Sequence, residues 1–548
     1  MPRPLDPRLI RYARGVRTLL IGSVVVASST AVLVVIQAFC LADVISRVFL
    51  DGESLDQTVA VLVLLGSVVL ARALLALIGE TLSQRAATRT SAQLRAALLG
   101  HVVRLGPVWL SGERRGQVAT LATRGIDSVE PYVARYLPQL VIAFVVPITV
   151  GVAILTQDLL AAVIVAVTAP LIPVFMVLVG MYTQTATAKQ WSTLGALAGH
   201  FLDVVAGLPT LKAFGRERVQ AEQMAEVDSR YRRATLGVLR ISFLSSFVLE
   251  ILATVSIAVV AVSIGLRLVS GTLDLRTGLV VLILAPEVYL PIRMVGAQFH
   301  AAAEGIEAAD QVFTVLAVEP ALTGATTEII WDDVVVDEVS ATYTGAQTVA
   351  LSPVSLVLRP GHVLAVVGSS GVGKSTLIAV LSGYLAPTCG VVRIGGVDLG
   401  SLDPEAWRSH IAVVSQEPAL LGPRVADDVR LRRPAASDAE VGEALRGVGL
   451  DPATLPDGIH TRVGDLASDV SAGQRRRIAL ARVLIGPPDL ILLDEPTAGL
   501  DDVAEAEVMA AIRRLADGGA AVLVVAHRPS LIAGADEVVQ LGAIGVGA

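Results

Sequence analysis

The segment Gly368-Ser369-Ser370-Gly371-Val372-Gly373-Lys374-Ser375 fits the phosphate-binding pattern G-x-x-x-x-G-K-[ST] at every position. The apolar run 363–367 before it predicts a buried strand, and residues 376–381 predict the beginning of a helix. In this context the glycines let backbone N–H groups surround a nucleotide phosphate, and the helix N-terminus adds a favourable dipole. We expect Lys374 to reach the β- and γ-phosphates and Ser375 to hold Mg²⁺. A glycine-rich loop that merely begins a helix is the weaker alternative, because the whole pattern is present.

A second predicted strand ends in two acids. Residues 491–493 are apolar and lead directly into Asp494 and Glu495. We expect Asp494 to hold Mg²⁺ and Glu495 to orient or deprotonate an attacking water. Solvated acids capping a strand are the alternative, and the phosphate-binding segment argues against it. Thr376, which follows that segment, is also expected to contact the nucleotide.

The composition predicts a membrane protein. Of the 548 residues, 53% are hydrophobic and 17% are charged, whereas a soluble protein has nearer a quarter charged residues. The net charge of −7 argues against nucleic acid as the main partner. The two cysteines, Cys40 and Cys389, predict no disulfide framework.

Six apolar segments have the length of a membrane-spanning helix. They cover residues 19–44, 58–77, 136–155, 159–181, 243–269 and 278–297. Arginine and lysine gather before the first segment and in the second and fourth connections, so both termini are expected in the cytoplasm of a bacterial cell. We therefore expect a helical membrane domain over 1–310 with helical extensions into the cytoplasm, a linker over 311–327 and an α/β nucleotide-binding domain over 328–548.

Further motifs follow the phosphate-binding segment in a characteristic order. They are Gln416 in a V-V-S-Q-E-P run, Val470-Ser471-Ala472-Gly473-Gln474 before a predicted helix, Ala498-Gly499-Leu500-Asp501, and His527 after a predicted strand. This order resembles the ATP-binding cassette (ABC) family, and six spans before one cassette resemble an ABC exporter, a fold that works as a dimer. The resemblance covers essentially the whole chain.

The ABC resemblance implies a role for each of these residues. Gln416 would sense Mg²⁺, His527 would contact the γ-phosphate, Asp501 would belong to the D-loop, and Tyr343 would stack on adenine. Ser471, Gly473 and Gln474 would contact nucleotide held by the opposite subunit. The usual signature is L-S-G-G-Q, so Val470 and Ala472 depart from it. The Ala472 methyl group either weakens that half-site or is small enough to be tolerated.

Three stretches of the membrane half resemble a narrower family. Residues 202–215, 284–287 and 298–305 are similar to the CydD-type subunits of heterodimeric CydDC transporters, which are required for cytochrome bd assembly. The resemblance implies a second, CydC-like half-transporter as partner and haem or a thiol such as glutathione or cysteine as cargo. The alternatives are a homodimeric exporter of lipids, drugs or peptides, and an ATP-gated regulator that pumps nothing. An intact Glu495 favours turnover.

Two membrane residues are candidates for binding the cargo. Arg72 lies inside the second span, where an unpaired cation is costly, so it should face a cavity or a partner. It would hold a carboxylate of haem or glutathione, or else pair with an acid such as Glu80 or Glu250, or snorkel. His300 would ligate the iron of haem b, or else make an inter-helix hydrogen bond.

Overall fold

The computed structural model describes residues 8, 14–110, 114–176, 178, 204–205, 207–343, 346, 348–463 and 470–542. The chain forms two compact units. The first is Met1–Leu99 with Gly116–Ala317, and the second is Gly100–Arg115 with Val318–Ala548.

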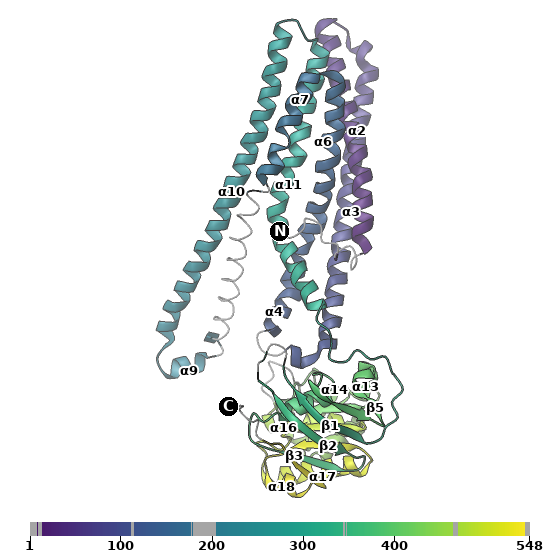
Figure 1. Ribbon diagram of the computed structural model, residues 1–548, viewed down its shortest axis with the longest axis vertical. Coiled ribbons are helices and arrows are strands. Elements are labelled where there is room, and N and C mark those ends of the chain that lie inside the picture. The colour runs from purple at the N-terminus through teal and green to yellow at the C-terminus, as the bar shows by residue number, and fades with distance from the viewer. Residues whose placement is uncertain are drawn as a thin grey trace. The chain divides into compact units, whose positions relative to one another are not determined.

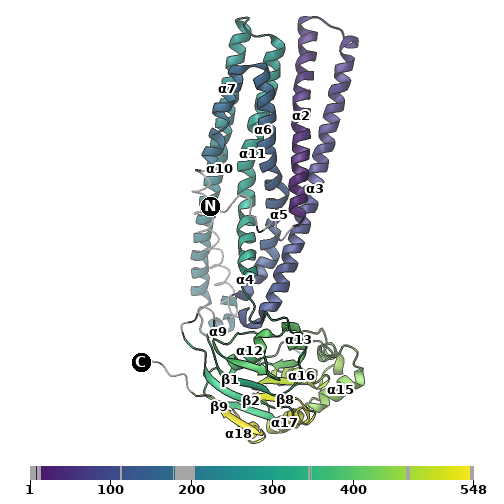
Figure 2. The ribbon, with the colours of Figure 1, turned by 45° about the vertical axis from the view of Figure 1, so that its right-hand side comes forward.

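The first unit is helical, with long helices that run side by side (Figures 1 and 2). These helices are α2 (Arg14–Leu50), α3 (Leu55–Trp109), α6 (Leu137–Gln157), α7 (Leu159–Thr168), α10 (Glu217–Val269) and α11 (Leu275–Leu316). The shorter elements are α4 (Arg114–Thr120), α5 (Val129–Pro131), α9 (Leu208–Ala213) and the π-helical turns Leu121–Gly125 and Tyr132–Tyr136. Two aspartates begin helices, since Asp158 accepts from the Ala161 amide before α7 and Asp274 accepts from the Thr277 amide before α11.

Six helices of the described part are long and apolar enough to cross a membrane, as the sequence predicted. The end of the fourth predicted span, residues 177 and 179–181, lies outside the described residues. The core of this unit forms where α6 packs against α2 and α11, with Val150, Ile154 and Leu284 fully buried. The span in α3 is the least buried of the six. Most of its apolar surface is therefore not covered by other parts of this chain.

The second unit contains two sheets. An antiparallel sheet has the order β2-β1-β4-β5, and a parallel sheet has the order β6-β7-β8-β3-β9. The strands are β1 (Val334–Ala341), β2 (Leu351–Leu358), β3 (Val363–Val367), β4 (Cys389–Ile394), β5 (Val397–Asp398), β6 (Ile411–Val414), β7 (Leu490–Asp494), β8 (Ala521–Val525) and β9 (Glu537–Gln540). The helices are α12 (Lys374–Leu381), α13 (Pro404–Ser409), α14 (Val425–Val429), α15 (Asp438–Gly447), α16 (Ala472–Leu484), α17 (Asp502–Asp517) and α18 (Pro529–Ala533).

The parallel sheet brings the sequence motifs to one edge. Strands β3, β6 and β8 are continuous apolar runs, and Ile491, Leu492 and Leu493 of β7 are fully buried, as expected for a sheet covered on both faces. Strand β8 lies between β7 and β3, and all three run in the same direction. Their carboxyl ends therefore share the edge where parallel α/β sheets bind ligands.

Residues 100–110 of the second cytoplasmic connection pack within this second unit. Gly106 has φ 79°, and a Cβ on it would lie 2.0 Å from Cδ1 of Tyr384. Arg408 lies over the Tyr384 ring, 4.5 Å from its centroid, and donates to the Arg104 carbonyl at 3.3 Å. His101 is buried, with Nε2 2.9 Å from the Val318 carbonyl oxygen. Since α11 ends at Leu316 and this unit resumes at Val318, both points fall inside the stretch expected as a linker.

Candidate active site

The phosphate-binding segment folds as a strand, a loop and a helix. Strand β3 ends at Val367, and α12 begins after Gly373, whose φ of 105° suits glycine alone. A Cβ on Gly373 would also lie 2.5 Å from the Ala350 carbonyl oxygen. Lys374 is 8% exposed, and its Nζ donates to the carbonyls of Gly368 and Ser369, both at 2.9 Å. The loop therefore holds the buried Lys374 cation against its own backbone carbonyls.

Asp494 and Ser375 meet across the sheet edge. The Ser375 hydroxyl donates to Oδ2 of Asp494 at 3.0 Å. Burial, together with the neighbouring Glu495, raises the pKa of Asp494, against the opposing effects of Ser375, Lys374 and His527. The pair presents two oxygen ligands to one point, which fits Mg²⁺ completed by nucleotide phosphates and water. Among the described residues no group of three or more His, Cys, Asp and Glu could form a metal site by itself.

Glu495 lies at the centre of the site. The Gln416 side-chain amide donates to its Oε2 at 2.9 Å, and His527 Nε2 is 3.1 Å from its Oε1. Its backbone has φ 49°, a left-handed conformation that is uncommon for residues other than glycine. Strain of this kind concentrates at functional positions. The arrangement fixes one carboxylate between an amide donor and an imidazole.

The predicted adenine-side residue lies beside the phosphate loop. The Tyr343 hydroxyl is 3.2 Å from Oγ1 of Thr376, the third residue of α12. The Tyr343 side chain is 37% exposed. The structure therefore brings Tyr343 and Thr376 together, with an aromatic surface open to solvent.

The signature residues and Asp501 each begin a helix. Ser471 and Gln474 form a reciprocal capping box at the start of α16, with the Ser471 hydroxyl accepting from the Gln474 amide at 3.2 Å. A Cβ on Gly473 would meet Leu500 Cδ2 at 3.1 Å. Asp501 caps α17 by accepting from the Ala504 amide at 2.8 Å.

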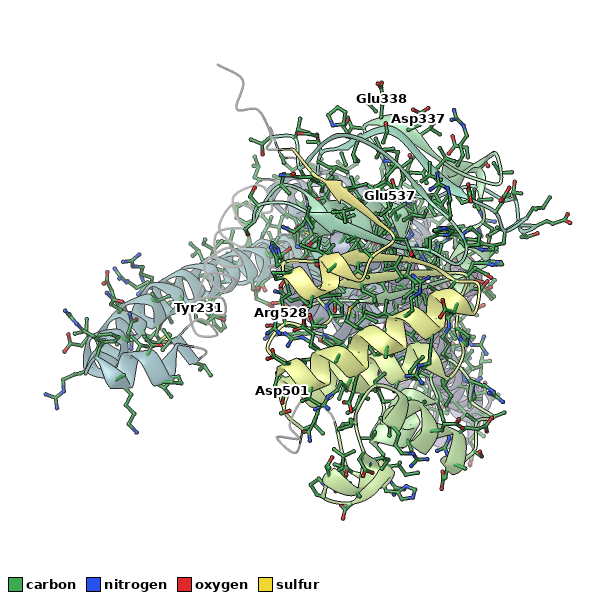
Figure 3. All side chains as sticks on the ribbon, turned by 90° about the horizontal axis from the view of Figure 1, so that it is seen from below. Tyr231, Asp337, Glu338, Asp501, Arg528 and Glu537 are labelled. Atoms are coloured by element: carbon green, nitrogen blue, oxygen red, sulfur yellow. The ribbon has the colours of Figure 1, made fainter. Side chains whose placement is uncertain are left out.

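Two arginines that the motifs did not single out link these segments. The Arg476 guanidinium donates to the carbonyls of Gln416, at 2.8 Å, and of Ala498. Arg528 pairs with Glu505 and donates to the Leu500 carbonyl at 3.0 Å. Figure 3 shows Arg528 and Asp501 at the same edge of the cassette. Their sequence signal was position alone, since Arg476 stands two residues after Gln474 and Arg528 stands directly after His527. Their backbone partners could not be read from the sequence.

In the membrane half, Arg72 has a different partner from those the sequence suggested. Its Nη1 donates to Gln37 Oε1 at 2.5 Å, and its Nη2 lies 3.9 Å from Glu287 Oε1. The suggested partners are engaged elsewhere, since Glu80 accepts from Gln84 and Glu250 pairs with Arg293. Pairing with an acid was one of the alternatives for Arg72. The acid beside it is Glu287 of α11, because tertiary packing brings α2, α3 and α11 together here.

His300 lies on α11, and its side chain is outside the described residues. It follows Glu287 on the same helix by about 20 Å along the axis, at the usual helical rise. Arg72 and His300 therefore mark separate positions along the membrane half.

Comparison with known proteins identifies the class. Residues 20–286 match the ABC transporter transmembrane region, and residues 351–498 match the ABC transporter family. A solved structure titled as a bacterial Atm1-family ABC exporter with ATP bound shares the fold, with a TM-score of 0.81 at 20% identity over 96% of this chain and 93% of that one. The chain belongs to the ABC transporter family.

Three relatives narrow the class further. CydD of Escherichia coli (strain K12), named a glutathione/L-cysteine transport system ATP-binding/permease protein, is 36% identical over 88% of this chain and 84% of its own. CydC of Bacillus subtilis (strain 168), named likewise, is 32% identical over 97% of this chain and 94% of its own. The transport ATP-binding protein AarD of Providencia stuartii is 35% identical over 90% and 86%.

These findings confirm several sequence-based expectations. The protein is an ATP-hydrolysing ABC transporter subunit, similar to the CydD type, with the exporter fold of six apolar helices followed by an α/β cassette. It is a multi-pass protein of the inner membrane, and its ATP-binding domain is cytoplasmic.

Proposed function

We propose that this chain is one half of a two-subunit transporter that uses ATP to move a small thiol, glutathione or cysteine, across the cytoplasmic membrane. The observation that carries the proposal is similarity over nearly the whole chain to CydD and CydC proteins named for glutathione and cysteine transport. The resemblance to CydD-type subunits adds a role in cytochrome bd assembly. In this proposal 1–310 is the membrane domain, 311–327 the linker and 328–548 the cassette.

The cassette residues would divide the chemistry of ATP hydrolysis. The loop 368–373, Lys374 and Thr376 would bind the phosphates, and Tyr343 would stack on adenine. Ser375 and Asp494 would hold Mg²⁺, which would supply positive charge to the phosphates. Glu495 takes the proton of the attacking water as it adds to the γ-phosphorus and the bond to ADP breaks. Support for this role comes from the amide of Gln416 and the imidazole of His527, which hold the Glu495 carboxylate from both sides.

The signature of this chain would act on nucleotide held by its partner. Ser471, Gly473 and Gln474 stand at the N-terminus of α16, where backbone N–H groups favour an anion. Asp501 stands at the N-terminus of α17 and would face the partner's cassette as part of the D-loop. Each ATP site would then need both subunits, which makes a heterodimer with a CydC-like half the working assembly.

Haem b is the second ligand to test, on the strength of the CydD-type resemblance. Arg72 would hold a propionate or His300 would ligate the iron. Because His300 lies about 20 Å along α11 from Glu287, the neighbour of Arg72, we assign Arg72 and His300 to separate positions rather than to one pocket.

The test is ligand-stimulated ATP hydrolysis by the chain purified with its partner subunit in lipid nanodiscs. Glutathione or L-cysteine should raise turnover several-fold, and Lys374→Ala should abolish both basal and stimulated turnover. Haem binding is measured by an absorption titration of the parent complex and of the His300→Ala complex. Stimulation by lipids or drugs but not by thiols would support a homodimer-type exporter instead, and nucleotide binding without turnover would support a regulator.

A further inference from the structure

A polar cluster of three residues lies deep in the membrane half. Gln37, Arg72 and Glu287 come from α2, α3 and α11, and the Arg72 and Glu287 side chains are 29% and 31% exposed. Helices α3 and α11 both begin on the side opposite the cassette, by the distribution of basic residues. Arg72 lies about 25 Å and Glu287 about 18 Å beyond those helix starts at the usual rise per residue. Both charges therefore lie well inside the apolar spans.

The two charges neutralise each other without a hydrogen bond. The Arg72 Nη2 to Glu287 Oε1 distance is 3.9 Å, beyond hydrogen-bonding range. Among the described residues, Arg72 donates one side-chain hydrogen bond, to Gln37, although a guanidinium carries five N–H groups. Arginine binds a carboxylate most strongly through two parallel hydrogen bonds. Gln37 thus positions the Arg72 guanidinium, but the Glu287 carboxylate makes no hydrogen bond with it.

A second ion pair of the membrane half shows the contrast. Arg293 donates directly to Glu250, so this cation and carboxylate satisfy each other. It joins α10 and α11, as a structural pair does. Glu287 and Arg72 instead leave a negative and a positive group side by side, each with hydrogen-bonding capacity to spare.

We infer that Arg72 and Glu287 form the receptor for the zwitterionic α-amino-acid end of the transported thiol. The ligand's carboxylate binds the Arg72 fork, and its ammonium binds Glu287. This inference rests on the proposed function and names its specificity determinants. The exchange of partners keeps the site neutral, because one cation and one anion in the protein meet one anion and one cation in the ligand, and unpaired charge is costly in the membrane.

The same charge balance disfavours other ligands. A haem propionate would neutralise Arg72 but leave Glu287 without a cation. An amine that lacks a carboxylate would leave Arg72 unpaired. Cysteine and the γ-glutamyl end of glutathione carry both groups on one carbon, as the site requires.

The experiment uses three thiols on the full two-subunit complex in nanodiscs. L-cysteine has both charged groups, N-acetyl-L-cysteine lacks the ammonium, and cysteamine lacks the carboxylate. The half-maximal concentration for ATPase stimulation should be about tenfold or more higher for each analogue than for L-cysteine, since each loses a charge-assisted hydrogen bond. Glu287→Gln should weaken L-cysteine to the level of N-acetyl-L-cysteine while leaving that analogue unchanged.

Variants of Arg72 test the other half of the receptor. Arg72→Gln should weaken L-cysteine to the level of cysteamine. Arg72→Lys keeps the charge but not the fork, so it provides a well-tolerated variant with an intermediate loss. Glu250→Gln, at the contrasting pair, should preserve the order of the three thiols.

The outcomes separate this inference from the proposed function. Equal potency of the three thiols on the parent complex, or an undiminished preference for the ammonium in Glu287→Gln, would overturn the inference alone. Failure of L-cysteine and glutathione to stimulate or bind the parent complex would overturn the proposed function, and the inference with it.

Discussion

At the scale of single residues, Glu495 holds the most constrained position of the cassette. Its φ of 49° costs backbone energy of about 1–3 kcal/mol, which the packed strand β7 sustains. The conformation turns its carboxylate to Gln416 and His527 rather than along the strand. We therefore expect the strained backbone of Glu495 to matter because it positions the carboxylate.

Two substitutions separate nucleotide binding from hydrolysis. Lys374→Ala removes the buried cation of the loop, so ATP should bind weakly and turnover should cease. Glu495→Gln keeps size and hydrogen bonding but removes the base, so ATP should bind and persist while turnover falls about 100-fold or more. Equilibrium binding of labelled ATP beside phosphate release distinguishes the two. Hydrolysis by Glu495→Gln at the parental rate would show that the active site lies in the partner.

The buried carboxylate of Asp494 lowers the stability of the folded cassette, and this loss can be measured without nucleotide. Burial raises its pKa above the ordinary 3.8, so the folded cassette retains the proton at a pH where the unfolded chain has released it. Stability is therefore lost as pH rises from 3.8 through the raised pKa, and the loss persists at neutral pH. Asp494→Asn should raise the melting temperature at pH 7.5 by about 2–4 °C for each kcal/mol regained, while abolishing ATPase activity. A lower melting temperature for this variant would contradict the burial argument.

The motifs could group the cassette residues in advance because their meeting depends on chain order. Once β3, β7 and β8 are neighbours, the residues after them must meet, so Lys374, Asp494 and His527 could be grouped in advance. Arg476 and Arg528 could not, because they donate to backbone carbonyls of loops distant in sequence. Every residue has a backbone carbonyl, so the residue types of these partners do not reveal the hydrogen bonds.

At the scale of elements, the end of α3 packs against the cassette where Gly106 lies beside the Tyr384 ring. Gly106→Ala would place Cβ 2.0 Å from the Tyr384 ring and force a side chain into φ 79°, so it should destabilise by about 1 kcal/mol or more. We expect a lower melting temperature and weaker thiol stimulation of ATPase. Tyr384→Ala should partly restore Gly106→Ala, because it removes the ring that the methyl group would meet.

Gly100 provides the matched control. It lies in the same helix α3, and a Cβ on it would meet no atom within 4 Å apart from its own helical turn. Gly100→Ala should therefore be neutral or slightly stabilising, as alanine favours a helix. Equal effects of the two substitutions would contradict the proposed role of Tyr384.

The membrane helices could be located by composition, but their pairings could not. Six spans followed from apolar length alone, and the described part of the chain has six helices that are long and apolar enough. The partner of Arg72 depended on which faces of α2, α3 and α11 meet, and apolar spans carry little information about that. Glu287 was visible as an acid in the sixth span, yet only packing brings it to Arg72.

At the scale of the whole molecule, the departure at Ala472 predicts an asymmetric pair of ATP sites. The chain supplies a complete set of Lys374, Asp494 and Glu495, so the site on this chain should be the active one, closed by the partner's signature. The site that uses Ser471, Gly473 and Gln474 should turn over slowly. Glu495→Gln should therefore remove nearly all turnover of the complex, whereas Ser471→Ala should remove little. A stable and fully active homodimer of this chain alone would contradict the asymmetry.

ATP-driven movement of a thiol is the central claim, and transport itself tests it most directly. Inside-out membrane vesicles carrying the two-subunit complex should accumulate radiolabelled L-cysteine or glutathione when ATP is added. Vesicles with Lys374→Ala or Glu495→Gln should accumulate none, although their complexes assemble. Equal uptake with and without ATP, or equal uptake by the parent and the Glu495→Gln vesicles, would contradict the account.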